Sequence, residues 1–410
     1  MIKKITIDQL CLGMFVHVLC GSWMDHPFWK SAFLLKDARQ LSQLRGSAVR
    51  EVRIDTSRGL DVPAAPSDAM APQASIPQEA QAPASVPSPV PSPAATTFTE
   101  EVARAGSIVA QARGAMHSMF QDVRLGKAID TEHCLPLVDD ITQSVSRNPG
   151  AIVSLARLKT SDDYTYLHSV AVCALMITLG RRLGLPEADI REAGLAGLVH
   201  DLGKALMPSE VLNKPGALTR EEFDIMKGHP KAGHELLVEG RGVGAVAMDV
   251  CLHHHEKVNG LGYPHGLKGD EISLFARMGA VCDVYDAITS NRPYKSGWDP
   301  ADSVQKMAQW SREGHFDDAI FQAFVKSIGI YPTGSLVKLK SGRLAVVVEQ
   351  SGKSLLRPCV RVFFCAQTNA PITPHLLDLD DDNAADPIAS RECAADWGLQ
   401  STDHLWLPGP

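Results

Sequence analysis

Two adjacent residues with metal-ligand chemistry, His200 and Asp201, follow an apolar run at residues 193–199. The run indicates a buried helix, so the pair would lie at the end of an element that is otherwise apolar. A buried imidazole beside a buried carboxylate is costly unless both have partners, and a metal ion is an effective partner for both. The dipeptide alone is a weak signal, because it occurs by chance and because Asp is common at helix ends.

A run of three histidines and a glutamate occupies residues 253–256, and Gly262-Tyr263-Pro264 follows it closely. Adjacent histidines on a helix point to different sides. Two of them can still reach one ion where the helix ends, and one of the three can be simple packing. Because Gly and Pro break helices, the second segment predicts a loop directly beside the histidines. A loop with glycine backbone and an aromatic face suits contact with a nucleotide.

Three further ligand-type residues stand alone in helical sequence: His168, His229 and Asp283. A lone histidine on a helical face is more often a core residue satisfied by its neighbours than a metal ligand. The case for these three as metal ligands is stronger because they occur in one helical region, in order, with the His-Asp pair and the histidine run.

The elements that must position these residues lie in a mostly helical region between residues 126 and 330. Apolar periodicity predicts helices at about 131–146, 164–183, 186–202 and 220–237. Pro186 stands where a helix start is expected, and Gly184 stands where a helix stop is expected. A further long helix is predicted over residues 98–125.

Regions of different composition flank the helices. Residues 1–62 contain short β-like runs, which predict a small β-rich module. Residues 63–97 are rich in Pro, Ala and Ser and predict a disordered linker. Residues 331–410 begin with two β-like runs around Ser341-Gly342, which predict a short hairpin, and continue into an Asp- and Ala-rich tail that we expect to be loosely structured beyond about residue 375. The fold class is therefore mainly α.

Composition limits the classes of function. No apolar run approaches the ~20 residues that span a bilayer, and the N-terminus lacks the pattern of a signal peptide, so a cytoplasmic location is expected. The 9 cysteines form no CxxC pair, which argues against a disulfide framework and against a thiolate zinc site. A net charge of -7 disfavours a nonspecific nucleic-acid binder.

The separated elements resemble the HD-GYP family of bacterial cyclic dinucleotide phosphodiesterases, a branch of the HD-domain hydrolases. The resemblance covers roughly residues 150–330. Its motifs are His-Asp-x-Gly-Lys at 200–204, His-Pro at 229–230, His-His-Glu at 254–256, Gly-Tyr-Pro at 262–264, Asp-x-x-Asp-Ala at 283–287 and Arg-Pro-Tyr-Lys at 292–295. Residues 1–62 and 98–125 also resemble a small uncharacterised domain often fused ahead of HD-GYP domains. The residues that carry this second resemblance are Gly21-Ser22-Trp23, His26-Pro27-Phe28-Trp29 and Ile54-Asp55.

The resemblance implies an HD-domain helical bundle that hydrolyses cyclic di-GMP to pGpG, GMP or both in bacterial second-messenger signalling. It also implies two divalent transition-metal ions, with Fe or Mn expected first and Ni or Zn as alternatives. A hydroxide that bridges the two ions would attack phosphorus. Carried over residue by residue, the ligands of one ion are His168, His200, Asp201 and Asp283, and those of the other are His229, His254 and His255, with Asp201 bridging the two.

Other family positions imply contacts with the substrate. Lys204 would neutralise charge on the nonbridging phosphate oxygens, and it forms the catalytic pair with Asp201. Arg292 and Lys295 match positions that grip the ligand phosphates. Tyr263 would shape the guanine or ribose pocket. The substrate-binding set is thus Gly262, Tyr263, Pro264, Arg292 and Lys295.

Three positions depart from the family pattern or fall outside it, and a fourth, Asp286, takes its expected role from one of them. Tyr164 stands where members with a third metal have a carboxylate, so a two-metal site is predicted. Asp286 then supports the ligands from outside the set, or stabilises its helix. Asn259 stands where many members have Asp, which alters the charge of the loop. His253 falls outside the motif and is given no role.

Two other functions stay open. The same pocket could serve a receptor for cyclic di-GMP, or a partner of a diguanylate cyclase or another signalling protein. Loss of a metal ligand would favour that reading, and no ligand is lost. The second alternative is hydrolysis of a linear nucleotide or of another cyclic dinucleotide such as 3′,3′-cyclic GMP-AMP. A homodimer and the roles of the two flanking regions are also open.

Overall fold

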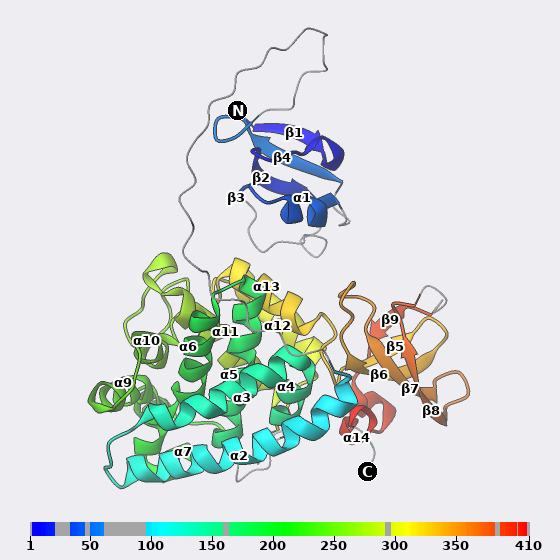
Figure 1. Ribbon diagram of the computed structural model, residues 1–410. Helices are drawn as coiled ribbons and strands as arrows, with labels where there is room; N and C mark the ends of the chain where they lie inside the picture. The colour runs from blue at the N-terminus through cyan, green and yellow to red at the C-terminus, as the bar shows by residue number, and fades with distance from the viewer. Residues whose placement is uncertain are drawn as a thin grey trace. The chain divides into compact units, whose positions relative to one another are not determined.

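The chain forms two compact units, residues 1–93 and 94–410, in a computed structural model (Figure 1). The structure describes residues 2–20, 33–45, 50–60, 96–158, 164–291, 297–381, 386–399 and 401–407. Nearly all of the expected linker at 63–97, and the aromatic residues of segment 21–29, lie outside the described residues. Among the helices that are described, none is long and apolar enough to cross a membrane.

The N-terminal unit contains a four-stranded antiparallel sheet in the order β1-β4-β2-β3. Its elements are β1 (Ile2–Thr6), η1 (Ile7–Gln9), β2 (Phe15–Cys20), β3 (Phe33–Leu34), α1 (Ala38–Arg45) and β4 (Glu51–Asp55). In β4, Val52 and Ile54 are buried whereas Glu51 and Arg53 are exposed. This alternation gives the sheet one apolar face, which packs on Leu10 and its neighbours. The predicted β-rich module is confirmed.

The second unit is mainly helical, as the sequence predicts. Its helices are α2 (Phe98–Arg124), η3 (Thr131–Cys134), α3 (Leu135–Arg147), α4 (Pro149–Arg157), α5 (Tyr164–Leu183), α6 (Glu187–Val199), η5 (Leu202–Leu206), α7 (Ser209–Leu212), α8 (Arg220–Met226), α9 (His229–Glu239), α10 (Ala245–His253), η6 (Gly269–Glu271), α11 (Leu274–Thr289), α12 (Pro300–Arg312) and α13 (Asp318–Ile328).

Helix α5 is the centre of the bundle and is buried along most of its length. A Cβ atom on Gly197 of α6 would lie 3.0 Å from the Cα of Cys173 in α5, so the two helix backbones approach closely at this glycine. Such close packing fixes α6 against α5 with little freedom to slide. It brings the end of α6, where His200 and Asp201 lie, beside His168 of α5.

The region expected as one helix at 220–237 is two helices, α8 and α9. The break falls at Lys227-Gly228, and Pro230 occupies the first turn of α9, where its missing N–H costs nothing. The apolar periodicity of the sequence continues across this break, so it predicts one helix where the structure has two. Its consequence is that His229 is the first residue of a new helix.

The C-terminal strands form a five-stranded antiparallel sheet in the order β8-β7-β6-β5-β9. The strands are β5 (Leu336–Leu339), β6 (Arg343–Glu349), β7 (Cys359–Cys365), β8 (Ala370–Asp378) and β9 (Ile388–Arg391), followed by η7 (Ala394–Trp397) and α14 (Asp403–Trp406). The predicted hairpin is present as β5 and β6. The tail that we expected to be loose instead supplies β9, η7 and α14, because strand pairing to β5 and packing of Trp406 order it.

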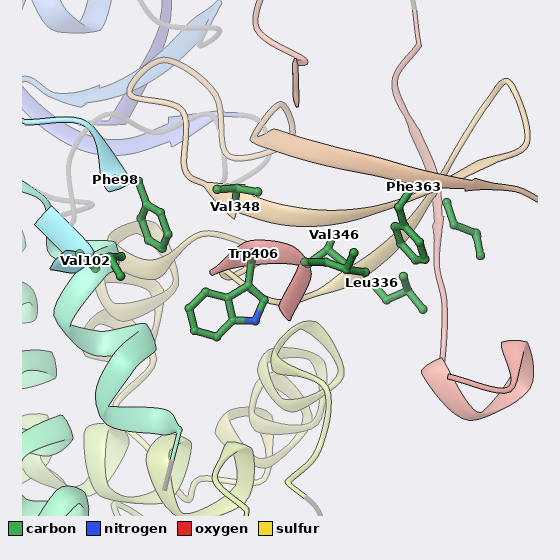
Figure 2. Close-up of a cluster of buried hydrophobic side chains, with 10 residues drawn as sticks. Phe98, Val102, Leu336, Val346, Val348, Phe363 and Trp406 are labelled. Carbon is green, nitrogen blue, oxygen red and sulfur yellow. The ribbon is translucent and has the colours of Figure 1, made fainter. Parts of the chain in front are cut away.

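An apolar cluster joins this sheet to the helices (Figure 2). Phe98 and Val102 of α2 lie on one side of it, strand residues such as Val346 lie on the other, and Trp406 of α14 lies between them. The rings of Phe98 and Trp406 pack edge to face with centroids 6.4 Å apart. Trp406 therefore holds both the tail and the sheet against the helical domain.

We expect Trp406→Ala to lower the free energy of unfolding of the second unit by about 3–5 kcal/mol, because truncating a buried Trp removes its transfer free energy and leaves a cavity. Chemical denaturation measures the loss. Leu376→Ala is the matched control, since Leu376 is 57% exposed on β8 and its loss should change stability by less than about 0.5 kcal/mol. Equal losses in the two variants would contradict the packing role of Trp406.

Candidate functional site

The first group of ligand-type side chains contains His168, His200, Asp201 and Asp283, and all four are buried. His168 comes from α5, His200 and Asp201 follow the end of α6, and Asp283 comes from α11. One nitrogen or oxygen atom of each residue lies within 4.8 Å of those of the others. His168 Nε2 lies 3.0 Å from Asp283 Oδ1 and 3.3 Å from Asp201 Oδ2. The consecutive helices α5 and α6 and the distant helix α11 thus converge on one point.

The second group contains His229, His254 and His255, whose ring nitrogens also lie within 4.8 Å of one another. His229 begins α9, whereas His254 and His255 follow the end of α10 at His253. Because the helix ends there, the two adjacent histidines leave helical spacing and point to the same place. This is the arrangement that the sequence predicts for the histidine run.

Asp201 lies between the two groups and gives one carboxylate oxygen to each. Its Oδ2 lies 3.3 Å from Nε2 of both His168 and His200. Its Oδ1 lies 3.1 Å from His229 Nε2 and 3.7 Å from His254 Nε2. The structure therefore brings together all seven predicted ligands in the two expected groups, with Asp201 shared.

The other ring nitrogen of most of these histidines is fixed by a hydrogen bond. Nδ1 of His200 donates to Gly197 O at 2.8 Å, Nδ1 of His229 donates to Met226 O at 2.8 Å, and Nδ1 of His254 donates to Val250 O at 3.0 Å. Since a carbonyl oxygen can only accept, these rings carry their proton on Nδ1. Each Nε2 then presents a lone pair to the centre of the cluster.

Several lone pairs consequently face one another without a proton between them. His229 Nε2 and His254 Nε2 are 3.3 Å apart, and both are acceptors in these tautomers. His200 Nε2 and Asp201 Oδ1 are buried and receive no hydrogen bond from any residue that the structure describes. Converging buried acceptors are unfavourable unless a cation lies among them. The residues therefore fit a metal ion in each group.

The protonation states suit metal ligands. Burial raises the pKa of Asp201 and Asp283, but Lys204 beside Asp201 and the neighbouring imidazoles outweigh burial and hold both pKa values well below their usual range. Burial also lowers the pKa of His254 well below its usual range and that of His255 to about 3. Ionised carboxylates and neutral imidazoles are the forms that bind divalent ions.

His168 lies among three carboxylates, and like His200 it has a pKa that neighbouring carboxylates raise against the effect of burial. Its Nε2 faces Asp201 and Asp283, and its Nδ1 is 2.6 Å from Asp286 Oδ2. Burial lowers the pKa of His168, yet these carboxylates reverse the shift and raise the pKa to about 10. Asp286 thus supports a predicted ligand from outside the set, and a hydrogen bond of this kind fixes the ring of a metal-binding histidine.

Lys204 and the Gly-Tyr-Pro loop lie at the edge of the cluster. Lys204 Nζ is 2.5 Å from Asp201 Oδ2, and the side chain keeps 21% exposure. The ring of Tyr263 packs on the ring of His255 with centroids 4.7 Å apart, and Tyr263 N–H donates to His255 O at 3.2 Å. A Cβ on Gly262 would lie 2.3 Å from the backbone nitrogen of Lys257, so only glycine fits this close approach.

The remaining predicted positions have varied surroundings. Arg292 and Lys295 lie outside the described residues. Tyr164 stacks on His168 with centroids 5.9 Å apart and offers no carboxylate. Asn259 Nδ2 donates to Glu313 O at 3.0 Å, while its Oδ1 accepts from Leu261 N–H at 3.0 Å.

His253 lies outside both groups, as expected from the motif. Its Nδ1 is 2.8 Å from Asp249 Oδ1, and its Nε2 is 3.2 Å from His265 Nδ1. Its ring therefore engages α10 and the end of the Gly-Tyr-Pro loop.

Glu256 has a role that the sequence did not assign. Its buried carboxylate accepts backbone hydrogen bonds from His265, Gly266 and Leu267 at 2.7, 3.1 and 3.1 Å. These bonds clamp the loop after Pro264 onto the chain beside His255. The one available signal was its place inside the His-His-Glu motif, directly after a predicted ligand.

Comparisons with known proteins cover both parts of the chain. A family described as "Domain of unknown function (DUF3391)" matches residues 2–134, and one described as "HD domain" matches residues 142–320, which include every residue of both groups. The chain is 53% identical over 407 residues to a Pseudomonas aeruginosa protein named cyclic di-GMP phosphodiesterase, covering 99% of this chain and 96% of that protein.

Two more distant matches cover part of the chain. A Vibrio cholerae protein named 3′3′-cGAMP-specific phosphodiesterase 3 is 30% identical over 198 residues, which are 48% of this chain and 42% of that protein. Among solved structures, Bd1817, an HDGYP protein from Bdellovibrio bacteriovorus, aligns with a TM-score of 0.47 and 15% identity, covering 80% of this chain and 99% of that one.

We expect Glu256→Ala to lower the free energy of unfolding by about 1–3 kcal/mol, because three backbone N–H groups lose their buried acceptor. Denaturant unfolding measures this loss, and limited proteolysis should cut the loop at 259–268 faster than in the parent. Glu239→Ala, at an exposed position, should leave both readouts unchanged. A loop that stays protected in Glu256→Ala would contradict the clamp.

Proposed function

Because the chain belongs to the HD-GYP family of cyclic di-GMP phosphodiesterases, with a DUF3391 domain ahead of the HD domain, we propose that it hydrolyses cyclic di-GMP at a two-metal centre. The observation that carries the proposal is the position of Asp201, whose two oxygens face two separate groups of ligand-type side chains. A carboxylate that faces both groups can bridge two ions, and two ions about 3.5–4 Å apart can act together on a phosphodiester.

In this proposal, His168, His200, Asp201 and Asp283 would hold one ion. His229, His254 and His255 would hold the other ion, with Asp201 shared between the two. Mixed imidazole and carboxylate donors without thiolate suit Fe or Mn, with Ni or Zn as alternatives. When bound, the two ions supply an activated water and offset the charge that builds up on the phosphoryl oxygens.

The chain's own residues then orient the substrate and hold its charge. The side chain of Lys204 is 21% exposed and lies beside Asp201. It places a positive charge where the nonbridging phosphate oxygens would lie. Burial, Asp283 and Asp201 raise the pKa of Tyr263, so its phenol stays neutral and can donate a hydrogen bond to ribose or base without taking part as a base. Arg292 and Lys295 are proposed to grip the second phosphate.

Hydrolysis is favoured over a receptor role because no predicted ligand is lost or turned away from the cluster. One cut of the ring gives the linear pGpG, and a second cut gives GMP. We propose that both cuts occur at this one centre. Among the described residues, no further cluster of metal-ligand side chains is present that could form a second centre. The expected cytoplasmic location fits a substrate that is an intracellular signal, and it stays a prediction.

The direct test is turnover of cyclic di-GMP by the purified full chain loaded anaerobically with Mn or Fe. Asp201→Ala should abolish turnover and lower the bound metal, because both groups lose a shared ligand. Asp270→Ala is the control, because the Asp270 side chain is fully exposed. Turnover that survives in Asp201→Ala would contradict the proposed centre, and faster turnover of 3′,3′-cyclic GMP-AMP would reassign the substrate.

Metal affinity of the first group should rise with pH. Below its raised pKa of about 10, His168 carries a proton in the absence of an ion, and that proton must leave when an ion binds. Affinity should therefore rise by up to about tenfold per pH unit between about pH 6 and 8. Competition with a fluorescent chelator measures this slope.

Asp286→Asn tests the cause of that slope. It removes one carboxylate that raises the pKa of His168, so the dependence on pH should become flatter. An affinity that does not change with pH in the parent would contradict the assigned protonation state.

A further inference from the structure

Helix α8 presents an exposed aromatic ring beside the site. The helix has no buried residue, and Phe223 on it is 45% exposed. A Thr219–Glu222 capping box and a 2.6 Å ion pair between Lys214 and Glu222 hold the helix in place. These contacts stabilise the helix without using Phe223, whose side chain stays nearly half exposed.

A run of aromatic rings connects Phe223 to the second histidine group. The ring of Phe223 lies 6.4 Å from the ring of Tyr263 at an interplanar angle of 81°. Tyr263 in turn packs 4.7 Å from the ring of His255. The ring of Tyr263 thus lies between Phe223 and the predicted metal ligand His255.

The surroundings of Phe223 suit a flat, electron-rich ligand. Lys227 Nζ lies 4.7 Å from the ring centroid of Phe223 and also pairs with Asp224 at 2.7 Å. A cation at an aromatic face is attracted by the ring quadrupole, and Lys227 could equally contact a base that stacks there. Nucleobases stack on exposed aromatic side chains because every base has a π face.

We propose that Phe223 is a stacking platform for one guanine base of the substrate, forming a nucleobase subsite at the mouth of the metal centre. The inference rests on the proposed function, since the phosphate must lie at the Asp201 centre for a base to reach α8. Phe223 then contributes to binding and positioning, and hydrolysis itself needs no group from it.

The test is binding of a hydrolysis-resistant phosphorothioate analogue of cyclic di-GMP to the metal-loaded full chain, measured by calorimetry. Phe223→Ala should weaken binding roughly 5- to 150-fold, the range that loss of one base–aromatic stack produces. Phe223→Leu keeps an apolar side chain but no ring, so it should weaken binding similarly, whereas Phe223→Trp should retain affinity.

Ile225→Ala is the matched control. Ile225 has the same 45% exposure on the same helix, but residues two apart do not share a helix face. Its loss should leave affinity unchanged. For methyl 4-nitrophenyl phosphate, a diester without a nucleobase, turnover by Phe223→Ala should equal that of the parent.

Each remaining outcome decides between the two proposals. Full affinity in Phe223→Ala or in Phe223→Leu overturns the stacking platform, and so does an equal loss for the base-free diester. Tight binding that depends on Phe223, without turnover of cyclic di-GMP, supports the platform and overturns hydrolysis. A parent that neither binds the analogue nor hydrolyses cyclic di-GMP overturns both.

Discussion

The buried carboxylate of Asp201 is the interaction on which the site depends. It is fully buried, and a charge in such a place is tolerated only with compensating positive charge or metal coordination. Five imidazoles and one ammonium group, from α5, η5 and α9 and from the ends of α6 and α10, lie around it. The close approach of α5 and α6 at Gly197 gives this arrangement its rigidity, because it fixes the end of α6 against His168.

Helix ends supply most of the ligands, and this explains the local sequence. His200 and Asp201 follow α6, His229 begins α9, and His254 and His255 follow α10. At a helix end, adjacent residues can point to one place, and backbone carbonyls of the last turn are free to accept from Nδ1. The same carbonyls therefore complete the helix and set the tautomer that leaves each Nε2 lone pair facing inward.

Sequence patterns predicted the mainly helical fold, and the resemblance to the HD-GYP family placed the seven ligand-type residues in the two groups that the structure brings together. That was possible because the motifs combine rare residue types with helix ends and glycine-proline loops. The division of residues 220–237 into α8 and α9 was missed, since apolar periodicity runs through the break.

The features that could not be predicted depend on contacts distant in sequence. The C-terminal sheet was underestimated because β8 is largely exposed and β9 is four residues long, so neither shows a clear alternation. Glu256 and Phe223 act through the folded shape of the Gly-Tyr-Pro loop and through α8. Their roles follow from hydrogen bonds and ring contacts that residue type alone does not reveal.

The most direct test of the shared carboxylate is anomalous X-ray diffraction from crystals of the full chain loaded with Mn or Fe. The account predicts two anomalous peaks about 3.5–4 Å apart, with one oxygen of Asp201 bound to each ion. A single ion, or two ions of which Asp201 binds only one, would contradict it.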